Sequence, residues 1–127
     1  MTLLHRLSMR KEEDAALEAA GAKVRIDRSG TQPIVSVSGR ISVDSAPHLR
    51  SVLLDLIPKS AGLVVDVTRV IRLDTAGLAV LLEAVSSAHD HSVSLRLTGV
   101  SGQPRRLAEL TELDGIFRTF GSEVEYL

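Results

Sequence analysis

The sequence predicts a single α/β domain built on a mostly parallel sheet of four or five strands, with an N-terminal hairpin and flanking helices. Segments with an apolar residue at every second position alternate with segments in which apolar residues recur every third or fourth position. That order is typical of strands and helices packed in layers around one core. The run at 63–67 contains three valines and is almost wholly apolar, which indicates a central strand covered on both faces.

The composition is that of one soluble globular domain. The chain has 127 residues, 44% of them apolar and 24% charged, with a formal net charge of -1. This balance gives no overall field that would attract nucleic acid or an anionic membrane. The chain has no cysteine, which excludes disulfides and thiolate chemistry and favours the cytoplasm. Neither a secretion signal nor a membrane-spanning segment is predicted.

Residues 1–21 differ in composition from the rest of the chain. A mixed charge run at 10–14 precedes an alanine-rich stretch that ends at Gly21. We expect an N-terminal extension that is either weakly ordered or forms a helix packed on the domain or on a second copy of the chain. Self-association is therefore left open, and the domain itself is expected over 22–127.

The first elements predicted are a hairpin and a helix. Apolar and polar residues alternate over 23–27 and again over 34–38, on either side of a turn sequence at 29–33. Between 49 and 57 the apolar residues instead follow one stripe of a helix.

Short polar side chains mark the expected starts of two helices. Asp44 or Ser45 can cap the first, and Asp74 or Thr75 can cap a second that ends near His89.

The C-terminal part predicts a strand at 93–97 and a third helix that begins near Pro104. Gly115 is expected to interrupt the regular structure, and 116–120 is either a further short strand or a loop. In a parallel sheet, the loops that lead into helices gather at the carboxyl ends of the strands. We therefore expect any site to involve the two loops at 39–45 and 68–75.

The sequence contains no pattern typical of catalysis. It has no glycine-rich phosphate loop. His89 and His91 are two residues apart, whereas two metal ligands on one helix face need a spacing of three or four. His48 lacks a third group that would orient it as a base. We therefore expect no enzyme activity, no cofactor and no metal site.

The residues at 74–78 read Asp-Thr-Ala-Gly-Leu and follow the buried strand predicted at 63–67. This combination resembles the core motif of STAS domains, the family shared by bacterial anti-sigma factor antagonists and the tails of anion transporters. In that family a buried strand ends in an Asp, and an apolar loop then leads to Asp-Ser/Thr-x-Gly-Leu, which opens a helix. The resemblance extends over about 24–120.

The resemblance implies a function. In the antagonists, the hydroxyl residue after the Asp is phosphorylated by a serine kinase that is itself the anti-sigma factor, and here that residue is Thr75. The unphosphorylated protein binds the anti-sigma factor and frees the sigma factor, whereas the phosphorylated protein lets go. The resemblance implies a partner-binding surface made of Ser42, Asp44, Ser45, Asp74, Thr75, Ala76, Gly77 and Leu78.

One departure and one alternative accompany this interpretation. In this chain, Arg40 and Ser42 replace the two acids of the family's Gly-Glu-Leu-Asp turn. Asp44 is then the nearest acid. The segment 69–78 also resembles the small STAS subunit of bacterial ABC transporters that move phospholipid, in which Thr75 would contact an ATPase subunit. The sequence at 113–120 looks more like the antagonists.

Overall fold

The computed structural model describes residues 20–127. They form a five-stranded sheet in the order β1-β2-β3-β4-β5, in which β1 is antiparallel to β2 and the other neighbours are parallel. The predicted α/β class, the hairpin and the mostly parallel sheet are confirmed. The expected extension over 1–21 falls outside the described residues except at its last two positions. The strands are β1 (Ala22–Asp27), β2 (Ile34–Ile41), β3 (Gly62–Leu73), β4 (Ser94–Val100) and β5 (Glu123–Tyr126).

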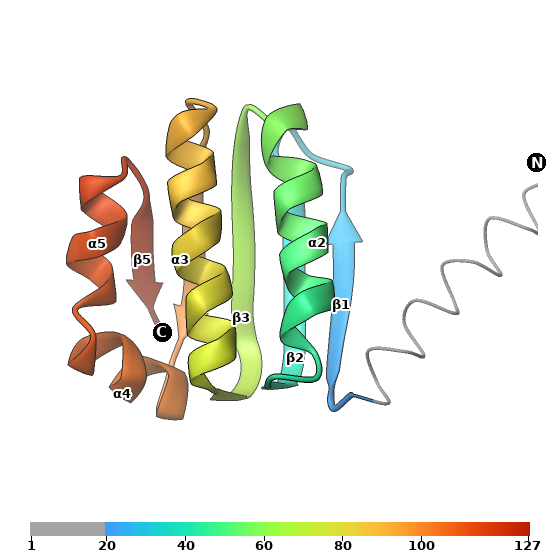
Figure 1. The fold of residues 1–127 in the computed structure, drawn as a ribbon. Helices are drawn as coiled ribbons and strands as arrows, with labels where there is room; N and C mark the ends of the chain where they lie inside the picture. Colours follow the sequence, from blue (N-terminus) through green and yellow to red (C-terminus); the bar gives the residue numbers. More distant parts are fainter. Residues whose placement is uncertain (1–19) are drawn as a thin grey trace, which may run out of the picture.

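Helices connect the strands and cover one face of the sheet. α2, α3 and α5 lie side by side over the same face, and α4 lies at the carboxyl edge (Figure 1). The main core is therefore the layer between helices and sheet. Among the described residues, no helix is long and apolar enough to cross a membrane. The helical segments are α2 (Ala46–Leu56), the 3-10 turn η1 (Ile57–Lys59), α3 (Thr75–Asp90), α4 (Gly102–Leu110) and α5 (Leu113–Thr119).

The central strand β3 has two unlike faces. Leu63, Val65 and Val67 point toward the helices and are at most 5% exposed. Val64 and Asp66 point to the opposite face, over which no described helix lies (Figure 1). Val64 is nevertheless only 6% exposed, so the strand is buried on both faces at this point, as predicted, although no described helix covers the second face. A short apolar run indicates burial, but it carries no information about which element provides it.

β3 is longer than predicted. It continues to Leu73 because β2 keeps pairing with it, past two register shifts, up to the pair Ile41 and Leu73. The predicted loop at 68–75 thus shrinks to Asp74, and the loop after β2 comprises residues 42–45.

The expectation of a strand or loop at 116–120 is wrong, because 116–119 belong to α5, Phe120 is the C-cap of that helix, and the last strand follows. Leu113 and Phe117, four residues apart, are both buried on the helix face that packs on the core. Gly115 lies inside this helix, on a side where an added Cβ would meet nothing within 4 Å. A seven-residue helix is too short for its periodicity to be distinguished from that of a strand.

Candidate functional site

The carboxyl edge of the sheet brings the two predicted loops together. The loop 42–45 leads from β2 into α2, and Asp74 alone leads from β3 into α3. The backbone N-H of Asp74 donates to the carbonyl of Ile41 at 2.9 Å, which ties the two connections to each other. The starts of α2 and α3 therefore lie at one edge of the sheet (Figure 1).

The start of α3 presents Thr75 to solvent. Asp74 occupies the N-cap position in an extended conformation, and Thr75 is the first helical residue. The predicted side-chain capping bond is not formed, because the Asp74 carboxylate instead meets the Arg72 guanidinium at 3.3 Å. The hydroxyl of Thr75 makes no hydrogen bond to any described residue. The first backbone N-H groups of a helix have no partner within it, so this hydroxyl lies where an anion is favoured.

The start of α2 is built differently. Ser45 is the N-cap residue, yet it is only 1% exposed and makes no capping bond. Its hydroxyl accepts the N-H of Ser42 at 3.0 Å and donates to the carbonyl of Arg40 at 3.1 Å. Ser45 therefore closes the loop from inside, and Asp44 is the exposed polar residue of this turn.

Gly77 and Leu78 lie beneath the edge. Both are buried, and Leu78 belongs to the core. A Cβ added to Gly77 would lie 2.5 Å from Leu73 Cδ1 and 2.6 Å from Ile41 Cγ2. The sequence left open whether this glycine admits a partner or accommodates close packing of α3 on the sheet. The contact distances support close packing.

Gln103 was not identified from the sequence. From the first turn of α4, its side-chain oxygen accepts the N-H of Leu73 at 2.7 Å and its side-chain nitrogen donates to the carbonyl of Leu73 at 2.9 Å. The pairing of β4 with β3 ends at Asp66, so Gln103 takes the place of a neighbouring strand at the last residue before Asp74. Its separation of 30 positions from Leu73 left no local pattern by which it could be found.

Two exposed apolar side chains also belong to this edge. Val43 in the first loop is 71% exposed, and Ile71 near the end of β3 is 62% exposed. Val43 stands between Ser42 and Asp44, and Ile71 stands between Val70 and Arg72, and the sequence pattern alone did not show that either is exposed. Exposed apolar groups beside a polar rim are typical of surfaces that bind another protein.

His89 and His91 make structural contacts. The ring of His89 packs edge-on against that of Phe120, with centroids 5.5 Å apart, and His91 Nδ1 lies 2.8 Å from the carbonyl oxygen of Ser87. Within residues 20–127, no group of three or more His, Cys, Asp or Glu side chains is arranged to hold a metal ion.

Helices α2 and α3 are joined on their outer side by an ion pair. The guanidinium of Arg50 donates to both carboxylate oxygens of Glu83, at 2.7 and 2.6 Å. This hydrogen bonding, more than the charge attraction, lowers the pKa of Glu83 and raises that of Arg50. The pair lies on the helix layer and plays no part in the carboxyl edge.

A family model described as Mlab, STAS domain, matches residues 24–119. This chain belongs to the STAS family. A comparison with curated protein sequences returned no match. Among solved structures, the STAS domain described here is similar to an anti-sigma factor antagonist from Mycobacterium paratuberculosis, with 25% identity and a TM-score of 0.64, over 80% of this chain and 85% of that one.

Two further solved structures are similar to this chain in fold, at lower identity. The anti-sigma factor antagonist SpoIIAA in its unphosphorylated form is 14% identical with a TM-score of 0.59, over 77% of this chain and 98% of that one. Mglu is 21% identical with a TM-score of 0.55, over 72% of this chain but only 24% of its own. The fold and family expected from the motif at 74–78 are thus confirmed.

Proposed function

We propose that this STAS protein is a bacterial, cytoplasmic anti-sigma factor antagonist. It binds a kinase-type anti-sigma factor through the carboxyl edge of its sheet, and phosphorylation of Thr75 ends that binding. It thereby regulates transcription without catalysis and without contacting nucleic acid. The similarity to the Mycobacterium paratuberculosis antagonist supports this role. The observation that carries it is the exposed hydroxyl of Thr75, unbonded among the described residues, at the first position of α3.

The proposed contact surface differs in part from the set expected from sequence. Ser45, Gly77 and Leu78 are buried, so they shape the edge from beneath. Val43, in the loop before α2, and Ile71, two residues before the end of β3, add exposed apolar area, and buried apolar contacts at the centre of an interface provide most of its affinity. The surface that we propose for the partner consists of Ser42, Val43, Asp44, Ile71, Asp74, Thr75 and Ala76.

Phosphorylation would act on the partner and leave the fold intact. A phosphate on Thr75 adds about 1.5 to 2 negative charges at a helix N-terminus, which favours anions, so the domain tolerates it. The same charge stands next to Asp74, on a surface that the partner binds when Thr75 is unmodified. Repulsion and loss of solvation then weaken a contact that existed before.

Arg40 sets a requirement on the partner. It is exposed at the end of β2, where the family's Gly-Glu-Leu-Asp turn has an acid, and among the described residues its guanidinium has no ion-pair partner. A partner that contacts this edge therefore places a carboxylate or a neutral polar group opposite Arg40, because like charges across an interface are strongly disfavoured.

The test is affinity capture from the source cell with wild type, Thr75→Ala and Thr75→Glu as baits. Ser51→Glu, which adds the same charge on the exposed side of α2, is the matched control. We expect wild type, Thr75→Ala and Ser51→Glu to recover a kinase-type anti-sigma factor, and Thr75→Glu to lose it. Incubation of the recovered complex with ATP should phosphorylate Thr75 in the wild type.

The apolar contacts are tested with the same baits. Val43→Ser and Ile71→Ser should reduce recovery of the partner, whereas Leu110→Ser, which alters another exposed apolar side chain, should not. A partner list that is the same for all baits would mean that Thr75 merely begins a helix.

A second candidate is the small STAS subunit of an ABC phospholipid transporter. The observation that favours it is the description of the matching family model, Mlab, STAS domain. In this case Thr75 would contact the ATPase subunit, and the wild-type bait would recover an ABC ATPase in place of the anti-sigma factor.

A further inference from the structure

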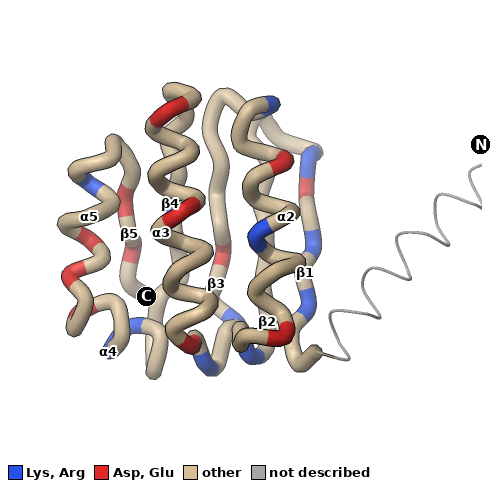
Figure 2. Tube along the Cα trace, viewed as in Figure 1, with Lys and Arg blue, Asp and Glu red and all other residues tan. Residues whose placement is uncertain are grey.

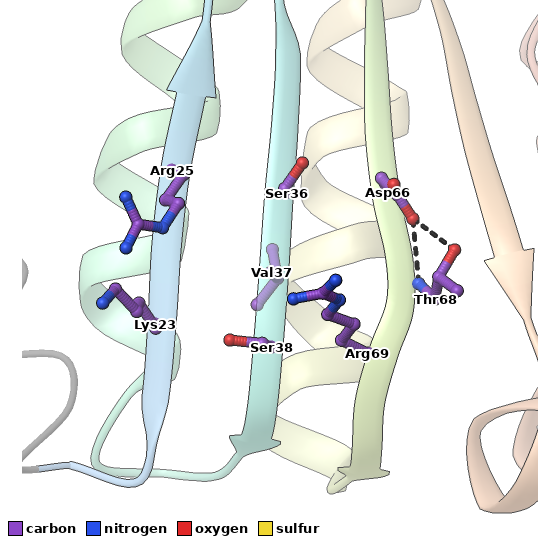
Figure 3. A pocket seen from close by; sticks show the side chains of 8 residues that line it. All are labelled: Lys23, Arg25, Ser36, Val37, Ser38, Asp66, Thr68 and Arg69. Atoms are coloured by element: carbon purple, nitrogen blue, oxygen red, sulfur yellow. Dashed lines mark hydrogen bonds between the residues drawn. The ribbon is translucent and has the colours of Figure 1, made fainter.

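The sheet face opposite the helices carries a groove of about 460 Å³, a size within the range of small-molecule sites. Its walls come from the first three strands, with β2 in the middle (Figure 3). No described helix lies over this face (Figure 1). The lining residues are Lys23, Arg25, Ser36, Val37, Ser38, Asp66, Thr68 and Arg69.

A register shift between β2 and β3 brings Arg69 into this groove. β2 takes two steps from Ser36 to Ser38, whereas β3 takes three over the same stretch and so places Arg69 opposite Ser38. Side chains alternate between the two faces of a strand, so without the extra residue Arg69 would point toward the helices and Val70 away from them. Instead Val70 is 5% exposed in the core and Arg69 is exposed. Extra residues of this kind are frequent beside functional sites, where they redirect a side chain.

The carboxylates that the first three strands place on this face lie toward the amino end of β2. Asp27 is the last residue of β1, and Asp66 lies in the next row of the register, together with Arg25. Asp27 accepts two hydrogen bonds from Ser29, and Asp66 accepts two from Thr68. Four residues of β1, about 13 Å, separate Asp27 from the row of Ser38. This distance exceeds the screening length of about 8 Å at physiological salt.

The face becomes basic toward the carboxyl end of β2. Ser38 lies opposite Lys23 on one side and opposite Arg69 on the other, so a hydroxyl stands between two cationic residues. Arg40 and Arg72 face each other in the next row, and Arg72 is paired with a carboxylate. Figure 2 shows the basic positions along β1 and at the carboxyl ends of β2 and β3. An anion is therefore favoured in the row of Ser38.

The donors in this row are available to a ligand. The hydroxyl of Ser38 and the guanidinium of Arg69 make no hydrogen bond or ion pair with any described residue. Arg69 reaches from β3 toward β2, and the hydroxyl of Ser38 points toward β1 (Figure 3). The planar fork of a guanidinium matches two phosphate oxygens, and a hydroxyl provides a further donor. The long stem of Lys23 lets its ammonium turn toward a ligand in the groove.

The remainder of the lining restricts the class of ligand. It contains no aromatic side chain on which a nucleobase could stack. Its one apolar residue, Val37, is 2% exposed, so the groove offers no apolar surface to a lipid chain. A ligand of this groove is therefore small, polar and anionic.

We propose that the groove binds the phosphate group of a small polar phosphate monoester, with Arg69 and Ser38 as donors and Lys23 as a second cation. The polar remainder of the ligand lies toward Ser36. This site does not depend on the function proposed for Thr75, because it uses none of the residues of the carboxyl edge.

The test is an NMR titration of the isotope-labelled full chain with glycerol 3-phosphate at constant ionic strength. We expect saturable shifts of the amide signals of Ser38 and Arg69, and no shift at Ser86 in α3. Inorganic phosphate should bind the same residues more weakly, because it leaves part of the groove empty. Sodium chloride at the same ionic strength should produce no saturable shift.

Variants identify the groups that hold the phosphate. Arg69→Gln should weaken binding by about tenfold or more, since it removes charge-assisted hydrogen bonds, and Lys23→Gln and Ser38→Ala should weaken it less. Arg106→Gln, an exposed arginine on α4, is the matched control. Asp27→Asn should change the affinity by less than about twofold, because its charge is screened at this distance.

Vesicles distinguish a soluble ligand from a lipid headgroup. Phosphatidylcholine vesicles with and without phosphatidic acid present the same phosphate monoester on a membrane. We expect the protein to sediment with neither. Sedimentation with phosphatidic acid, in a protein that does not respond to glycerol 3-phosphate, would overturn the proposal in favour of a membrane surface.

Three further results would overturn it. The first is the absence of saturable shifts at Ser38 and Arg69, and the second is equal affinity in Arg69→Gln and Arg106→Gln. The third is a set of shifts centred on Asp44 and Thr75, which would assign the phosphate to the starts of α2 and α3. Unchanged amide positions in β4 show in each variant that the fold is intact.

Discussion

Two hydroxyl residues begin the two helices at the carboxyl edge, and they differ in every respect that matters for function. Ser45 at the start of α2 is 1% exposed and bonded on both sides, to the N-H of Ser42 and the carbonyl of Arg40. Thr75 at the start of α3 is exposed and has no hydrogen bond among the described residues. Their positions at the helix starts differ by one residue, since Ser45 is the N-cap of α2 and Thr75 is the first residue of α3. The comparison shows that accessibility, more than residue type or capping position, distinguishes a candidate switch from a structural hydroxyl.

The largest expected effect comes from removing the buried hydroxyl. Ser45→Ala leaves the N-H of Ser42 and the carbonyl of Arg40 without this partner, so we expect a loss of about 1–3 kcal/mol in the free energy of unfolding. Thr75→Ala removes no internal bond and should change it by less than about 0.5 kcal/mol. Urea denaturation of both variants measures the difference. Ser42→Ala, whose hydroxyl makes only a long bond to Asp44 at 3.3 Å, is the control. Equal losses in the free energy of unfolding for Ser45→Ala and Thr75→Ala would mean that the two hydroxyls do not differ in their structural role.

Two glycines inside helices extend the comparison. Gly77→Ala places a methyl group within 2.6 Å of Leu73 and Ile41, and we expect a net destabilisation of about 1–2 kcal/mol, since overpacking outweighs the better helix propensity of alanine. Gly115→Ala meets no neighbour within 4 Å and should stabilise the protein by up to about 1 kcal/mol. Thermal unfolding of the two variants should thus shift in opposite directions. A stabilised Gly77→Ala would contradict close packing as the reason for this glycine.

The amide of Gln103 holds the strand end that precedes Asp74. Gln103→Ala removes both bonds to Leu73, so we expect about 1 kcal/mol of destabilisation and faster hydrogen exchange at the Leu73 amide. Gln103→Glu keeps an acceptor for the N-H but has no donor for the carbonyl, and its effect should be intermediate. Arg106→Ala on the exposed side of α4 is the control. Unchanged exchange at Leu73 in Gln103→Ala would mean that β3 is held without it.

The smallest effect concerns the exposed pair of Arg50 and Glu83. The hydrogen bond from Arg50 lowers the pKa of Glu83 in the folded protein, so the pair contributes stability above the ordinary Glu pKa. That contribution to stability is lost as the pH falls through the lowered pKa of Glu83 in the folded protein. Glu83→Gln should therefore be slightly less stable than wild type at pH 7 and equal to it in acid. Denaturation at several pH values tests this, and about 1 M salt should shrink the difference. If the difference in stability between wild type and Glu83→Gln instead grew in acid, the pKa of Glu83 would be raised in the folded protein and the assigned direction would be wrong.

The sequence determined the site as far as local pattern reaches. It placed Thr75 at the start of a helix after a buried strand, and it indicated the two loops that the structure joins through Asp74 and Ile41. It did not find Gln103, Val43 or Ile71. Gln103 acts on a residue 30 positions away, and the exposure of the two apolar side chains depends on how β2 and β3 end at the sheet edge.

By itself, the sequence determined the fold class, the hairpin, the order of the first seven elements and the family, because periodicity and short motifs are properties of neighbouring residues. Only the tertiary structure decided the rest. It made 113–119 a helix through the burial of Leu113 and Phe117 and enclosed Ser45 while exposing Thr75. It also left one face of the sheet without a helix over it among residues 20–127. The physical reason is that burial is decided by which distant segments pack together, and a local pattern contains no record of them.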